Sequence, residues 1–488
     1  MATTNSAKQL EWKLRALDEF RRKVSEMAAD EVDTVALEEE LRETLNAVGM
    51  EVMGEVLARA DTKAPTLEVR GERWGNRRET MGTYTTLFGE VKILRSTYSP
   101  GGGGKVMIPL DLRLGIVERR YTPKVARILT HAVAVMTSQE AEGFLKEVGL
   151  AAVSRSTIHR LPQAVAARHE ELRDAINEAL RESDSVPTDA TVVQACLDGV
   201  MVPQDGEHAR PRGRKTTAPK APRHEARYQR AQRSSPQDDD EEDGRAWHEA
   251  MVGTLAFWNA EGEHLKTIYI ARMPESGHET VASELELELH AILRERPDLD
   301  VSFASDGDAA QWHYLEGIAA ALPDAERRTT TFNLDFWHAA GYVDDAAKAA
   351  LEDDSDSKVQ AEEWKTSLKE HVHGATRVLK SMRYFRDQLS GARRETIETS
   401  INYLAKQASA GRMKYRTSRD LRHPIGSGPV EAAAKTLVDV RMRRSGARYD
   451  QHGGQTILNF RSALYSDRFA KLWDMLHQSY TATVREAA

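Results

Sequence analysis

Cysteine is almost absent from this 488-residue sequence, which contains only Cys196. A single cysteine excludes an internal disulfide framework and a zinc site built from cysteines, and it fits a reducing compartment. Because Cys196 lies inside an apolar run, we expect it to be buried in a strand rather than to act as a nucleophile.

Long apolar runs are missing as well. No stretch approaches the roughly 18 residues that would cross a bilayer. Residues 1–10 also lack the apolar stretch of a signal peptide. We therefore expect a soluble, cytoplasmic protein with no membrane partner.

Positive charge is not in excess, since 68 Lys and Arg stand against 76 Asp and Glu, giving a net charge of -8. Read as a global number, this charge argues weakly against a nucleic-acid partner. Nucleic-acid binding depends on local basic surface, however, so the distribution of charge matters more than the total. The length predicts roughly two to four structural units.

The first part of the chain alternates between helical and strand patterns. Residues 1–65 have apolar residues at helical spacing and predict a helical arm for packing or dimerisation. Residues 66–120 contain the alternation of a β-hairpin, with Gly89 at the turn. Residues 121–185 are helical again, and 138–158 resembles a helix-turn-helix for DNA binding. A small helical bundle without DNA contacts is the alternative there.

The region 186–338 carries signals in the order strand, strand, strand, helix, strand, helix, strand. This is the order of an RNase H-like sheet, in which two parallel strands extend three antiparallel ones. Residues 205–245 lose hydrophobic periodicity and predict a disordered insertion. Residues 339–410 predict a helical insertion, and 411–488 the last part of the core with the C-terminal helices. The expected class is α/β, an RNase H-like mixed five-stranded sheet with an all-helical insertion, plus mainly helical N-terminal domains.

Three acidic residues interrupt local hydrophobicity where an active-site edge is expected. Asp198 interrupts the first strand, Asp306 ends the fourth, and Glu431 opens a helix. Taken singly, an Asp-Gly pair is usually a turn and a Glu at a helix start is usually a partner of the helix dipole. Together they predict a catalytic site that binds Mg²⁺, or Mn²⁺, through carboxylate oxygens. A pair of such ions would serve phosphoryl transfer.

Several short motifs carry a family resemblance. They are Asp198-Gly-Val, Ser305-Asp306-Gly, His423-Pro-Ile-Gly-Ser-Gly-Pro-Val-Glu431, Arg441-Met-Arg-Arg-Ser-Gly446, Gly454-Gln-Thr-Ile-Leu458 and Leu87-Phe-Gly-Glu-Val91. Over about residues 80–475 the chain resembles the DDE transposases, specifically the ISKra-type insertion-sequence group, and more distantly the Mutator-type transposases. It departs from the pattern at Tyr449, where a tryptophan is expected, and in an expanded 205–245 region.

The resemblance implies a DNA transposase that cleaves at transposon ends and joins the 3′-hydroxyl to target DNA. The implied partners are the terminal inverted repeats, target DNA and further copies of the chain in a homodimer or higher homo-oligomer. Asp335 and His338 match an Asp-x-x-His signature, which implies a role at the DNA near the cleavage site. A helix-capping Asp335 with a packed His338 is the alternative.

Local positive charge gathers around the third acidic motif. Lys435 is four residues beyond Glu431, on the same helix face, and is expected to point toward a bound phosphate. The cations expected to bind DNA are Lys435, Arg441, Arg443, Arg444 and Arg448. Surface positions near a helix C-terminus are the alternative for Arg443 and Arg444. Trp312 and Trp364 are candidates for base stacking, with core packing as the favoured alternative.

Two rival functions fit the same sequence. An RNase H-like nuclease would hydrolyse nucleic acid without joining its product to a second DNA molecule. A DNA-binding regulator would carry the same core with an idle catalytic site. The acidic triad favours an enzyme over the regulator.

Overall fold

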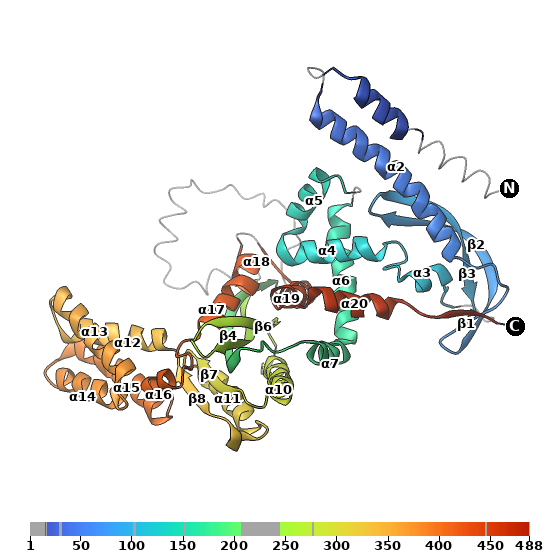
Figure 1. Ribbon diagram of the computed structural model, residues 1–488. Coiled ribbons are helices and arrows are strands. Elements are labelled where there is room, and N and C mark those ends of the chain that lie inside the picture. The colour runs from blue at the N-terminus through green and yellow to red at the C-terminus, as the bar shows by residue number, and fades with distance from the viewer. Residues whose placement is uncertain are drawn as a thin grey trace. The chain divides into compact units, whose positions relative to one another are not determined.

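The computed structural model describes residues 15, 17–28, 32–100, 104–150, 153–205, 245–275, 278–444 and 447–487. The chain divides into two compact units, Met1–Ile176 with Phe469–Ala488, and Asn177–Arg468 (Figure 1). Nearly all of the predicted 205–245 insertion lies outside the described residues. Within the described ranges, no helix is long and apolar enough to cross a membrane.

The first unit contains a four-stranded sheet in the order β3-β2-β1-β9, with every neighbouring pair antiparallel. The strands are β1 (Leu67–Val69), β2 (Glu72–Thr86), β3 (Gly89–Ser99) and β9 (Val484–Glu486). Gly89 begins β3 directly after the hairpin turn, with Thr86 as its partner across the turn. The last strand of the chain thus completes an N-terminal sheet, whereas the sequence assigned 411–488 to the catalytic core.

The first unit also contains helices. They are α2 (Thr34–Ala60), α3 (Pro109–Leu114), α4 (Pro123–Val135), α5 (Ser138–Glu147), α6 (Arg155–Glu171) and α20 (Phe469–Tyr480). Of these helices, α2, α3 and α4 contact the sheet. A capping box between Thr137 and Glu140 starts α5. Gly149 follows α5 with a φ of 67°, a conformation that suits glycine. The region predicted as helix-turn-helix therefore contains two consecutive helices, and Gly149 follows the end of the first.

The second unit contains a five-stranded mixed sheet in the order β6-β5-β4-β7-β8. Its strands are β4 (Ala190–Asp205), β5 (Arg245–Asn259), β6 (His264–Arg272), β7 (Asp300–Ser305) and β8 (Thr330–Leu334). The pairs β4·β5 and β5·β6 are antiparallel, and the pairs β4·β7 and β7·β8 are parallel. The predicted α/β class with a mixed five-stranded sheet is confirmed.

One face of this sheet is covered by α10 (Glu279–Glu295) and α11 (Ala309–Ala320). Leu285 and Leu289 of α10 pack with strand residues such as Leu255 and Phe303 in one buried cluster. Trp312 belongs to the same cluster and is 1% exposed, so its predicted core position is confirmed. The short helix η1 (Ala325–Arg327) leads from this layer into β8.

After β8 the chain forms a group of helices beside the sheet (Figure 1). They are α12 (Phe336–Ala350), α13 (Asp354–Glu370), α14 (Gly374–Arg386), α15 (Gly391–Ser409) and α16 (Tyr415–Asp420). The alanine-rich run of α12 is buried against α13 and α15. Trp364 is 4% exposed in this separate apolar core, which confirms its core packing. The helical segment predicted between the fifth strand and the Glu431 helix is therefore an α-helical group with a core of its own.

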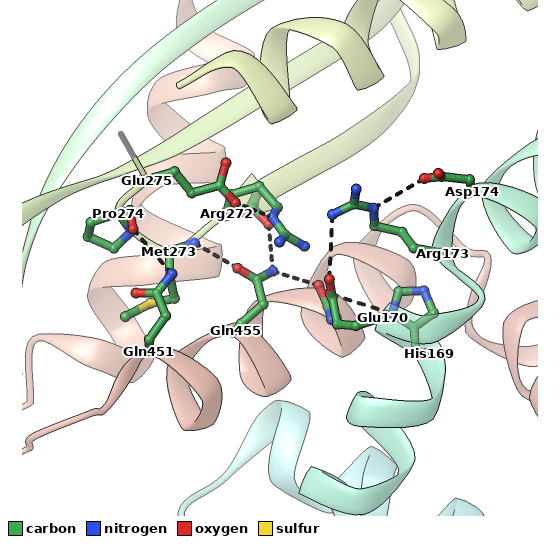
Figure 2. Close-up of polar contacts among 12 residues, drawn as sticks. His169, Glu170, Arg173, Asp174, Arg272, Met273, Pro274, Glu275, Gln451 and Gln455 are labelled. Carbon is green, nitrogen blue, oxygen red and sulfur yellow. Dashed lines mark hydrogen bonds and ion pairs between the residues drawn. The ribbon is translucent and has the colours of Figure 1, made fainter. Parts of the chain in front are cut away.

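The remaining helices of the second unit are α17 (Gly428–Ala433), the π-helix η2 (Ala434–Asp439), α18 (Val440–Met442) and α19 (Gln451–Tyr465). The helix α7 (Arg173–Ser183) spans the division between the units. Figure 2 shows how α19 is attached to the end of β6. Gln455 accepts from the Met273 N–H at 2.9 Å, and Gln451 donates to the Pro274 carbonyl at 3.2 Å.

Candidate active site

Asp198 on β4 and Asp306, the residue directly after β7, lie at the same level of two neighbouring parallel strands. The last paired residues of β4 and β7 are Cys196 and Ala304. Asp198 and Asp306 each follow two residues later, so the register of the ladder places them opposite each other. Side chains two residues apart along a strand point to the same side. Cys196 itself is fully buried, as predicted.

Electrostatics connects Asp198 with the other two predicted carboxylates. Burial raises the pKa of Asp198 to about 7, and the negative charges of Asp306 and Glu431 add to this rise. The backbone N–H of Gly199 acts in the opposite direction, since it donates to Asp198 at 2.8 Å. Asp306 and Glu431 are thus close enough to oppose the ionisation of Asp198, and excess negative charge collects around this residue.

No cation within the described residues neutralises this charge, because none of the three carboxylates makes an ion pair with them. Asp306 Oδ1 accepts from its own turn, from the Asp308 N–H at 3.1 Å and the Ser305 hydroxyl at 3.4 Å. Among the residues that the structure describes, no group of three or more His, Cys, Asp or Glu is arranged to hold a metal ion. The acids share a neighbourhood, but their oxygens are not gathered to coordination distances.

Glu431 is carried by α17 and its side chain is exposed. The helix continues directly into the π-helical turn η2, and such turns recur at functional sites. The buried guanidinium of Arg461 on α19 donates to the Thr436 carbonyl inside that turn. The motif around Gly454 to Arg461 therefore supports the helix that presents Glu431.

The segment 423–427, just before α17, is tied to the sheet at successive residues. His423 is 3% exposed and lies 2.8 Å from the Thr331 hydroxyl and 3.2 Å from Asp300 Oδ2. Burial lowers the pKa of His423 and outweighs the opposing effect of Asp300. This buried histidine anchors the start of the segment to β7 and β8.

Backbone carbonyls fix the middle of the same segment. Asn333 donates to the Pro424 carbonyl at 3.2 Å, and the Phe336 N–H donates to the Ile425 carbonyl at 3.0 Å. Gln194 on β4 donates to the Gly426 carbonyl at 2.8 Å. The route into the Glu431 helix is therefore set by the buried side chains of Gln194 on β4 and Asn333 on β8 and by the first backbone N–H of α12.

Asp335 completes the attachment. It caps α12 by accepting from the His338 N–H at 2.7 Å, and its other oxygen accepts from the Ser427 N–H at 2.5 Å and the Ser427 hydroxyl at 2.9 Å. The residue is 1% exposed. Asp335 thus has the helix-capping role of the alternative interpretation, and it clamps the residue that precedes α17. DNA would reach its carboxylate only if this clamp opened.

The second residue of the Asp-x-x-His signature contacts Tyr403, which is bonded to the Asp306 backbone. His338 is exposed, and its ring stands 5.9 Å from the Tyr403 ring. Tyr403 on α15 donates its hydroxyl to the Asp306 carbonyl at 2.6 Å, and Gln407 donates to the Gly307 carbonyl at 3.3 Å. The helical group thus holds the turn that presents Asp306. Sequence reasoning missed Tyr403 and Gln407, because nothing local marks a contact across about a hundred residues.

The predicted DNA-binding cations divide by exposure. Lys435 and Arg444 are exposed, and the exposed Arg443 pairs with Asp439 at 3.2 Å. Arg448 is half-buried. Arg441 is 5% exposed and donates to the Tyr449 hydroxyl at 2.6 Å, so in this structure it supports the chain locally. Tyr449, at the position where tryptophan was expected, accepts that bond and donates to the Arg441 carbonyl at 3.0 Å.

Comparison with known proteins adds nothing to this geometry. No protein-family model matches the chain. No curated protein matches it either.

Proposed function

We propose that this protein is a DNA transposase of the DDE type with an RNase H-like core, in which Asp198, Asp306 and Glu431 are the catalytic carboxylates. The observation that carries the proposal is the level placement of Asp198 and Asp306 on parallel strands, with the pKa of Asp198 raised to about 7 by burial and by the other two acids. The motif resemblance described above supplies the reaction class.

The donor set fits a divalent cation in charge and in chemistry. All three candidate ligands are carboxylates, the type that Mg²⁺ and Mn²⁺ prefer. The pKa of Asp198 is raised by burial and by the neighbouring negative charges, and a cation would neutralise those charges. Two bound ions would activate the attacking oxygen and stabilise the leaving one. The oxygens are not yet at ligand distances. Glu431, with its exposed side chain, is the member of the set free to move toward the strand-borne pair.

Different residues of the chain would position the three carboxylates and the DNA. The hydrogen-bonded register of β4 and β7 fixes the two aspartates, and Tyr403 and Gln407 hold the turn of Asp306. The clamp from Asp335 to Ser427 sets where α17 begins. Lys435 and Arg444 are exposed on the segment after Glu431, where they would neutralise backbone phosphates. His338 lies beside this set and would contact the DNA near the cut.

Transposon-end recognition is proposed for α5 and α6 of the first unit. Arg155, Ser156 and His159 at the start of α6 are exposed, as the residues of a recognition helix must be. We propose terminal inverted repeats and target DNA as partners, and a homodimer or higher homo-oligomer as the active form, since two transposon ends must be handled together.

Strand transfer is the test. A duplex copied from the DNA that flanks the reading frame, with a free 3′-hydroxyl, is incubated with supercoiled plasmid, the full chain and Mg²⁺. The proposal predicts covalent joining by the native protein, and none by Asp198→Asn or Asp306→Asn, both of which still bind the duplex. Joining that persists in both variants would overturn the proposal.

One observation favours a second candidate, the DNA-binding regulator with an idle site. The described acids do not form a group ready to hold a metal, which is how an inactive core would look. The regulator predicts DNA binding without any Mg²⁺- or Mn²⁺-dependent cleavage or joining. The nuclease alternative predicts cleavage without joining, so the same assay separates all three.

A further inference from the structure

The helix α14 presents an unpaired row of cations on its outer face. Arg377, Lys380 and Arg383 are exposed, and none of them has an acidic partner among the residues that the structure describes. At about 100° per residue these positions, together with Thr376 and Tyr384, fall within about 120° of the helix circumference. They therefore form one stripe, which we call the α14 basic face.

The opposite side of α14 is committed to the core of the helical group. Val378, Leu379 and Met382 are buried there, with Trp364 and Phe385 packed nearby. The basic face therefore cannot turn inward without exposing this apolar surface. Its cations stand on a rigid element rather than on a loop.

Several other cations of the same helical group are paired with carboxylates, unlike the three cations aligned on this face. Arg386 pairs with Asp387 at 2.7 Å and Glu398 at 3.2 Å, and Arg393 pairs with Glu352 at 2.8 Å. Arg416 pairs with Asp420 at 2.8 Å and Glu370 at 3.3 Å. Carboxylates are thus plentiful in this group, yet none lies against Arg377, Lys380 or Arg383 in the described residues.

We propose that the α14 basic face binds the phosphate backbone of a DNA duplex. This assignment rests on the proposed function for the identity of the nucleic acid. From Arg377 to Arg383 the row extends about 9 Å, and one DNA strand carries about three phosphates over that axial length. Thr376 and Tyr384, the latter 66% exposed, lie within the stripe and offer hydroxyl donors for phosphate oxygens.

Backbone contact of this kind gives affinity without sequence preference, and it depends on salt. Each neutralised phosphate contributes about 0.9 to the slope of log K against log salt for a DNA duplex. Three contacts therefore correspond to a slope change of about 2 to 3. The α14 basic face would raise the affinity for any duplex regardless of sequence. Such binding suits target or flanking DNA better than the terminal repeat, which must be recognised by its sequence.

The test measures binding of the full chain to a 30-bp duplex of arbitrary sequence in EDTA, across a salt series. The combined Arg377→Gln, Lys380→Gln, Arg383→Gln variant is expected to lose about 2 to 3 from the slope and roughly tenfold or more in affinity near physiological salt. Its matched control, Arg386→Gln with Arg393→Gln and Arg416→Gln, removes the same charge from paired cations. The control is expected to leave the slope unchanged.

A charge-keeping variant, Arg377→Lys with Arg383→Lys, is expected to retain most of the binding and guards against a general folding defect. An unchanged slope on the DNA duplex in the Gln variant overturns the proposal. Binding in EDTA involves no chemistry. A chain that fails in strand transfer but shows the slope change therefore refutes the proposed function and leaves the α14 basic face standing.

Discussion

The two strand-borne acids and the helix-borne acid of the candidate site are held in different ways. Asp198 and Asp306 take their relative level from the backbone ladder of β4 and β7, whose last pair lies two residues before each of them. Glu431 takes its place from side chains that bond the segment 423–427, chiefly Gln194, Asn333 and Asp335. A ladder is fixed by many equivalent hydrogen bonds, whereas a few side-chain bonds can be removed singly. The first part of the site is therefore robust in position, and the second is adjustable.

Removing a strand-borne acid is the strongest way to test this difference. Asp198→Asn is expected to reduce strand transfer by about 10³-fold or more, equivalent to about 4 kcal/mol of transition-state stabilisation. When both proteins are free of metal, the free energy of unfolding at pH 8 is expected to be higher for the variant than for the native chain. The reason is that the variant lacks a half-buried carboxylate with a raised pKa.

Rates of joining and thermal unfolding measure the two effects. Glu249→Gln, a neighbouring acid that also contacts His278, is the control. Equal loss in both variants would contradict a special role for Asp198.

Breaking the clamp tests the adjustable part. Asp335→Ala removes a helix cap and leaves the buried Ser427 N–H unpaired, with an expected cost of about 3 kcal/mol in unfolding free energy. Strand transfer is expected to fall further than DNA binding, since the start of α17 is released. The matched control is Asp353→Ala, which removes an exposed aspartate that caps α13 through Ser355 and Asp356. The control should cost about 1 kcal/mol without affecting joining. Urea unfolding that shows equal costs would refute the clamp.

The hydroxyl of Tyr403 offers a smaller perturbation on the strand-borne side. Tyr403→Phe keeps the ring stack with Tyr342 at 4.0 Å but removes the bond to the Asp306 carbonyl. We expect a loss of about 1 kcal/mol in stability and a fall in kcat with little change in KM. Tyr342→Phe, which preserves the same stack, is the comparison. If both variants behave alike in single-turnover joining, the Tyr403 hydroxyl does not position Asp306.

His423 gives the mildest effect and depends on pH. Burial lowers its pKa in the folded state, so the unfolded chain takes up a proton first as the pH falls through about 6.5. Stability from this residue is present above that pH and is lost below it. Asp300 and Thr331 are the groups that face the ring. Unfolding free energies between pH 7.5 and 5.5 should therefore fall less steeply in His423→Gln. The exposed His313→Gln serves as control, and parallel curves for native chain and His423→Gln would refute this account.

The sequence predicted the elements whose signals are local. The burial of Cys196, the core positions of Trp312 and Trp364 and the mixed five-stranded sheet follow from apolar runs and their spacing, and the structure confirms them. Asp198 could be placed within the first strand and Asp306 at the end of the fourth for the same reason. Their shared level needs the register, which only the paired strands reveal.

What the sequence could not predict rests on distant partners. Tyr403 reaches the Asp306 turn from a helix almost a hundred residues away, and β9 pairs with β1 across nearly the whole chain. The π-helical turn after Glu431 replaces the regular helix that the spacing to Lys435 assumed. Asp335 carried a helix-cap signal, but its second role at Ser427 had none. Such contacts depend on tertiary packing and produce no periodic pattern in the sequence.

Metal binding tests the central claim most directly. Mn²⁺ is titrated into the full chain bound to a duplex with a 3′-hydroxyl, and bound ions are counted by electron paramagnetic resonance. The account predicts about two ions for each active site, with binding lost in Asp306→Asn and weakened in Glu431→Gln. Unchanged Mn²⁺ affinity and stoichiometry in both variants would contradict the claim that these carboxylates form one metal site.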